Sequence, residues 1–142
     1  MISTHAEKAA ELFKAGYNCS QSVAAAFCDV TKTDEKTMLA TAAPFGGGFG
    51  RNREVCGAIS GGCLVLGLLY GYTDPSDKTA KSEHYALVRD FMARFSVRFG
   101  SVICRELLGG ATAESPQSAT PRFTKAVRVS NWYSPQRKSS TK

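Results

Sequence analysis

The chain has 142 residues, of which 43% are hydrophobic and 21% are charged. This length and balance predict a single domain that buries a substantial apolar core. No run of about 18 apolar residues is present, so we expect no transmembrane helix. The first residues lack the apolar core of a signal peptide, which favours a cytoplasmic protein.

The formal net charge of +6 comes from the end of the chain. Residues 1–114 carry twelve basic and twelve acidic side chains, and the remaining six bases follow with no acid among them. We therefore expect a helical cysteine-motif domain over residues 1–118 and a basic, poorly ordered tail over residues 119–142. Because the body shows no basic patch or recognition motif, nucleic acid is not expected as a partner.

Apolar residues at helical spacing predict a first helix over residues 4–17. Asn18 is a suitable N-cap for a second helix, whose buried face extends to Val30. No period-two pattern indicates a strand. Further helices are expected over residues 35–43, 56–70, 78–99 and 102–108.

The segment over about residues 57–70 is apolar nearly all round, so we expect this helix at the centre of the fold. The longest predicted helix, residues 78–99, has an apolar stripe in which His84 is interpreted as a half-buried core residue. The sequence therefore predicts an all-α protein, a compact multi-helix bundle around the central apolar helix.

A glycine-rich run over residues 46–50 holds too much glycine for the interior of a helix or strand. It precedes a helix, but it lacks the strand and the ordered glycines of a nucleotide-binding motif. The glycines either let the backbone pass close to a neighbouring helix or leave room for a cofactor above Cys56. Arg51 and Arg53 either add positive potential there or are solvated loop charges. The candidate cofactor-binding residues are Gly47, Gly48 and Gly57.

Three of the five cysteines stand at predicted helix starts. Cys19 follows Asn18, Cys56 follows the glycine-rich run, and Cys104 comes three residues after Ser101. The N-terminus of a helix carries positive partial charge and free N–H groups, which favour the thiolate over the thiol. In a reducing compartment, clustered cysteines indicate catalysis or metal binding. We expect these three sulfurs to converge in the folded chain.

Cys28 and Cys63 lie inside apolar helical segments and are interpreted as packing residues. Their spacing from Cys19 and Cys56 along a helix is too great for a disulfide. The chain has no CxxC pair, its two histidines lack the acidic partners of hydrolytic zinc sites, and its serines show no triad pattern. The chemistry therefore rests on the three helix-start cysteines.

The segment from Cys56 to Gly61 reads CGAxxG and resembles the motif of the small redox-active proteins described by the signature C-GCAxxG-C-C. The resemblance covers about residues 4–110. Flanking segments agree as well, at residues 18–23, 45–51 and 99–109.

This resemblance implies a cysteine-rich helical protein with a redox role, in a family linked with oxidoreductases and transporters. A related domain lies beside haem in a split-Soret type cytochrome, which adds an iron–sulfur cluster as an alternative cofactor. The family pattern ends with a fourth cysteine, but this chain has none after Cys104, and Phe123 stands about where that thiol would fall.

Sequence and resemblance together predict a small thiol-redox or electron-transfer protein, an oxidoreductase with a partner protein and with Cys56, Cys19 and Cys104 as catalytic residues. Cys56 is expected to be accessible and the most activated thiol, with a lowered pKa, and another of the three would resolve it. The first alternative is a module that binds a metal or an iron–sulfur cluster through Cys19, Cys56 and Cys104. Its fourth ligand would be Cys63, solvent or a partner chain, and a homodimer is the candidate assembly. The second alternative is a structural helical protein with inert thiols.

Overall fold

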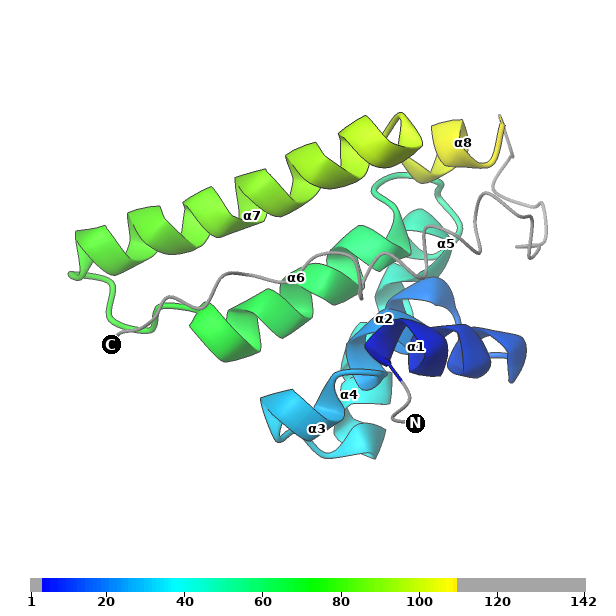
Figure 1. Cartoon of the computed structure of the whole chain (residues 1–142), viewed down its shortest axis with the longest axis horizontal. Helices are drawn as coiled ribbons and strands as arrows, with labels where there is room; N and C mark the ends of the chain where they lie inside the picture. The colour runs from blue at the N-terminus through cyan, green and yellow to red at the C-terminus, as the bar shows by residue number, and fades with distance from the viewer. Residues whose placement is uncertain (1–3, 110–142) are drawn as a thin grey trace.

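The computed structural model describes residues 4–109, and within them nearly all ordered structure is helical (Figure 1). The only pairing between extended segments in this part of the chain is a single antiparallel bridge of Val55 with Ile103. The all-α prediction is therefore confirmed, whereas the predicted tail and its boundary lie outside the described residues. The elements are α1 (His5–Lys14), α2 (Cys19–Ala25), α3 (Cys28–Thr31), α4 (Glu35–Ala42), the 3-10 turn η1 (Ala43–Phe45), α5 (Gly46–Phe49), α6 (Gly57–Tyr70), α7 (Lys78–Phe99) and α8 (Cys104–Leu107).

Side-chain caps fix where most of the longer helices begin. The Asn18 side chain accepts a hydrogen bond from the backbone N–H of Gln21, while Gln21 Oε1 accepts one from the Asn18 backbone N–H, so α2 starts with a reciprocal capping box. Thr4 caps α1 in the same way. Asp34 and Asp77 cap α4 and α7. These starts agree with the sequence, because capping depends on local residues.

The second predicted helix is shorter than expected. Helix α2 ends at Ala25, and Phe27, with φ −105° and ψ 12°, separates it from α3. The chain therefore turns before Val30, whose side chain is 42% exposed rather than on a buried face. The sequence pattern failed here because it assumed one continuous helical phase.

Helix α6 is buried over its first half. Gly57, Ala58 and Ile59 are buried against α2, which is itself almost completely buried, and against α5 and η1. Toward its end the helix becomes exposed, and Leu68 is 52% exposed. The expectation of a central helix surrounded by protein is therefore not confirmed for the whole of α6.

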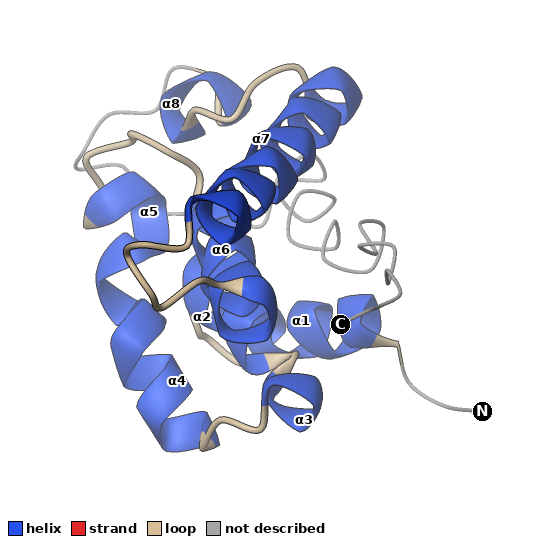
Figure 2. Ribbon diagram, turned by 90° about the vertical axis from the view of Figure 1, so that its left-hand side faces the viewer, coloured by secondary structure: helices blue, strands red, loops and turns tan. Residues whose placement is uncertain are grey.

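Helix α7 runs back along α6 to form an antiparallel hairpin that projects from the other helices (Figures 1 and 2). Phe91 and Phe95 are its buried residues, and Phe91 packs directly over Gly62 of α6. Gly100, with φ +94°, ends α7 and turns the chain toward α8. Within residues 4–109, no helix is both long and apolar enough to cross a membrane.

Candidate functional site: three buried thiols

The structure brings the three predicted site cysteines together. Cys19 is the first residue of α2, Cys56 immediately precedes α6, and Cys104 is the first residue of α8. All three are free thiols with 0% exposure. Cys19 Sγ lies against Gly57, the residue after Cys56, and the backbone of Cys104 is bonded to Glu54, two residues before Cys56.

A short backbone ladder connects the second and third of these cysteines. The Cys56 N–H donates to the Val102 carbonyl at 2.8 Å, and the Cys104 N–H donates to the Glu54 carbonyl. With Val55 paired to Ile103, Cys56 and Cys104 lie on one face of the ladder, diagonal to each other. Diagonal neighbours have Cα atoms about 7 to 8 Å apart, so a disulfide between Cys56 and Cys104 requires a small movement of the backbone.

Cys19 reaches the same place through Gly57. A side chain at Gly57 would begin 2.2 Å from Cys19 Sγ, so the sulfur occupies the space that the missing side chain leaves. The Gly57 position also faces the backbone of Ser20 and Phe45. Gly57 therefore allows the start of α2 to approach the start of α6 closely.

The glycine-rich run forms the wall beside Cys104. Five successive residues have positive φ, between 64° and 70°, and the first three of them belong to α5, so this run forms a left-handed turn. A side chain at Gly48 would begin 2.6 Å from the Glu54 backbone nitrogen and 2.8 Å from Cys104 Cβ. The residues in the turn are Gly47, Gly48, Phe49, Gly50 and Arg51.

The room expected for a cofactor is filled by the protein itself. At Gly47 a side chain would meet Arg51 Cγ at 2.8 Å, and at Gly48 and Gly57 it would meet the atoms named above. The structure thus gives these glycines a packing role, while cofactor binding by them stays a prediction. Within residues 4–109, no three His, Cys, Asp or Glu side chains are arranged to hold a metal ion. A metal on Cys19, Cys56 and Cys104, with or without Cys63, therefore gains no support from this geometry.

The sequence named Arg51 and Arg53 together, as a source of positive potential or as solvated charges, and the structure buries only Arg53. Its side chain is 1% exposed, and its Nη1 donates a hydrogen bond to Cys104 Sγ at 3.8 Å. Its backbone, with φ +62°, is held by the Gly47 carbonyl at 3.1 Å and by the Arg105 N–H at 3.2 Å. Arg51 is exposed instead. Nothing in the sequence Arg51-Asn52-Arg53 distinguishes the buried arginine from the solvated one.

The expectation that Cys56 is an accessible, activated thiol is wrong. Burial raises the pKa of Cys56, the nearby Cys19 raises it further, and these effects outweigh the backbone N–H groups of Ala58 and Ile59 that lower it. The predicted donors at the start of α6 are present. The full desolvation of the sulfur nevertheless disfavours the charged form more than the helix start favours it.

The other two cysteines belong to the packing of the helices, as the sequence indicated. Cys28 packs against a small cluster formed by Ala24, Met38 and Ala42. Cys63 packs against the main core, and burial raises its pKa to about 11. That core includes Cys19 and Cys56, so Cys63 shares a cluster with them and Cys28 does not. The three-thiol site is defined here as Cys19, Cys56 and Cys104.

Comparison with known families agrees with this arrangement. Residues 17–131 match the family described as "Putative redox-active protein (C_GCAxxG_C_C)". No curated protein and no solved structure matches the chain. The matched region contains Cys19, the Cys56-Gly57-Ala58 motif and Cys104, but no cysteine after Cys104 to complete the signature. The chain thus belongs to the C_GCAxxG_C_C family.

Proposed function

We propose that this protein is a thiol-redox protein whose three-thiol site cycles between free thiols and one disulfide. The observation that supports the proposal is the meeting of Cys19, Cys56 and Cys104 from three separate elements, while Cys28 packs in a different cluster. A structural protein with inert thiols has no need to bring its three helix-start cysteines to one point. Membership of the redox-active family supports the same reading.

The reaction is a thiol–disulfide interchange. Two thiols of the site, Cys56 with Cys19 or Cys104, give up two protons and two electrons and form one sulfur–sulfur bond. The disulfide of a partner protein accepts them and becomes two thiols. The atoms and electrons balance without a further oxidant or cofactor.

Access to the site requires movement, because all three sulfurs are buried. The left-handed turn over residues 47–51 is the segment best suited to move. Phe49 and Arg51 adopt positive φ there without being glycine, and this conformation costs about 1 to 2 kcal/mol per residue. Because this turn is already strained, opening it costs less free energy than opening a regular helix.

The test is a map of the disulfides formed by the full chain. Reduced protein is equilibrated with mixtures of reduced and oxidised glutathione, quenched with acid and analysed by peptide mass spectrometry. We expect a single disulfide that contains Cys56 and that a dithiol reductant removes. The Cys56→Ala variant should lose it, whereas the matched controls Cys28→Ala and Cys63→Ala should keep it.

Two results would oppose the proposal. Disulfides that form only after unfolding, or that contain Cys28 or Cys63, would favour a structural role for the thiols. A coloured protein on anaerobic purification, with visible absorption lost in Cys56→Ala but kept in Cys28→Ala, would favour the iron–sulfur alternative drawn from the sequence.

A further inference from the structure

The guanidinium of Arg53 is buried, which is unfavourable without polar partners. Moving a cation out of water costs several kcal/mol unless polar partners replace the lost hydration. Arg53 is nevertheless the largest of the fully buried side chains in the described residues, and its Nη1 lies 3.8 Å from Cys104 Sγ. The backbone of Arg53 is also tied on both sides, to Gly47 and to Arg105. The fold thus fixes this cation at the edge of the three-thiol site.

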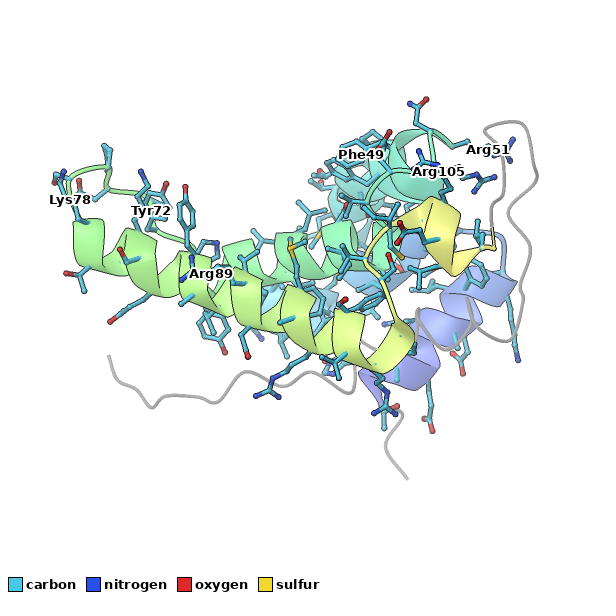
Figure 3. All side chains as sticks on the ribbon, turned by 90° about the horizontal axis from the view of Figure 1, so that it is seen from above. Phe49, Arg51, Tyr72, Lys78, Arg89 and Arg105 are labelled. Carbon is cyan, nitrogen blue, oxygen red and sulfur yellow. The ribbon has the colours of Figure 1, made fainter. Side chains whose placement is uncertain are left out.

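The comparison with Arg51 shows that the loop sequence does not require this burial. Both arginines have positive φ, and they are two residues apart, yet Arg51 extends into solvent (Figure 3). The difference lies in what each side chain meets. Arg53 points to a cysteine that the family signature contains, whereas Arg51 packs its first carbons over Gly47.

We propose that Arg53 is a positioning residue that holds the Cys104 sulfur and makes Cys104 the thiol that attacks the partner's disulfide. This inference rests on the proposed thiol-redox function and names the order of its steps. A hydrogen bond from a guanidinium stabilises developing negative charge on sulfur, which is the form that attacks. At Cys56 the largest effects on the pKa, burial and the neighbouring Cys19, disfavour the thiolate instead.

The two steps follow from this assignment. In the first, the Cys104 sulfur attacks one sulfur of the partner's disulfide, a Cys104–partner disulfide forms, and the second partner sulfur leaves and takes up the proton that Cys104 lost. In the second, the Cys56 sulfur attacks the Cys104 sulfur across the ladder, and the first partner sulfur leaves with the proton of Cys56. Two site thiols are oxidised and one partner disulfide is reduced.

The test measures how fast iodoacetamide labels each cysteine of the reduced full chain, by quenched time points and peptide mass spectrometry. Cys19 is the internal reference because it is equally buried, so opening of the site affects both sulfurs. We expect Cys104 to be labelled faster than Cys19. Arg53→Gln should lower the ratio of the two rates about tenfold, the scale of one hydrogen bond to a charged group. Arg53→Lys should keep most of the ratio, and Arg51→Gln should leave it unchanged.

The outcomes separate this inference from the proposed function. An unchanged ratio in folded Arg53→Gln, or a wild-type chain in which Cys19 or Cys56 is labelled first, overturns the role of Arg53. If circular dichroism shows that Arg53→Gln does not fold, Arg53→Lys decides: a folded lysine variant that loses the ratio overturns the role. If the role of Arg53 is overturned but the site disulfide still forms in glutathione, the proposed thiol-redox function stands. If Arg53→Gln lowers the labelling ratio but no site disulfide forms, the Arg53–Cys104 contact is supported and the proposed function is overturned.

Discussion

The two ends of helix α6 have opposite surroundings, and the end with more large apolar residues is the more exposed one. At its start, Ala58 and Ile59 are buried under α2, α5 and η1, and the three-thiol site lies beside them. At its end, Leu68 and Tyr70 are 52% and 39% exposed, with α7 packed along one side. Figure 3 shows this separation, with Phe49, Arg51 and Arg105 near the thiol end and Tyr72, Lys78 and Arg89 along the projecting hairpin.

This difference teaches that hydrophobicity along a helix does not determine where its core lies. The thiol end is buried because small residues allow other elements to approach it. Gly57 accommodates Cys19 Sγ, and Gly61 accommodates the Ser20 backbone, whose carbonyl oxygen would be 2.6 Å from a side chain there. At the far end Gly67 meets nothing within 4 Å. Gly57 and Gly61 therefore lie where α2 contacts α6, whereas Gly67 faces open space.

The largest expected effect comes from adding one methyl group at each end of α6. Gly57→Ala places a carbon 2.2 Å from Cys19 Sγ, so the sulfur or the α2 backbone has to move. We expect a loss of about 1 to 3 kcal/mol in the free energy of unfolding, the usual scale of overpacking. Gly67→Ala, in the same helix, should raise that free energy by about 0.5 to 1 kcal/mol, because alanine is the better helix former.

Urea denaturation of the two variants and the wild type measures both changes. Equal effects at the two positions would mean that α2 does not approach α6 as closely as the structure shows.

A smaller effect is expected from pH. Burial raises the pKa of Cys56 above the value near 8.5 of an unfolded thiol. Above about pH 8.5 the unfolded chain releases this proton while the folded chain keeps it, so folding stability falls as pH rises, by up to about 1.4 kcal/mol per pH unit. Below that pH the thiol is protonated in both states and adds no slope.

The unfolding free energy of reduced protein, followed from pH 7.5 to pH 10 in urea, tests this sign. Cys56→Ala should show a shallower decline than the wild type, and the half-exposed control Cys28→Ala should decline nearly as steeply as the wild type. Identical slopes in all three proteins would show that the Cys56 sulfur is solvated.

Local chemistry explains what the sequence could predict. The capping residues Asn18, Asp34 and Asp77 determine helix starts through bonds within three residues, and the longest helix was predicted with its observed bounds, residues 78–99. The placement of three cysteines at helix starts depends on the same local signals. Their convergence could be expected only because three helix starts can share one end of a bundle.

Tertiary contacts decide what the sequence could not predict. The pKa of Cys56 depends on how completely α2 and the glycine-rich run bury it, because burial opposes the effect of the helix start. The choice of Arg53 over Arg51 for burial depends on the left-handed turn, in which the non-glycine residues Phe49 and Arg51 adopt positive φ. Propensity disfavours that conformation, so no sequence pattern indicates it.

The most direct test of the central claim, that three thiols from separate elements form one redox site, is nuclear magnetic resonance of protein labelled only at cysteine and glycine. The reduced protein should show contacts between the Cys19 β-protons and Gly57, and between the Cys104 β-protons and Gly48. On oxidation, the Cβ shift of Cys56 and of one of these two partners should move to the disulfide range, while those of Cys28 and Cys63 stay in place. Absence of these contacts, or a shift at Cys28 or Cys63 in place of Cys56, would contradict the account.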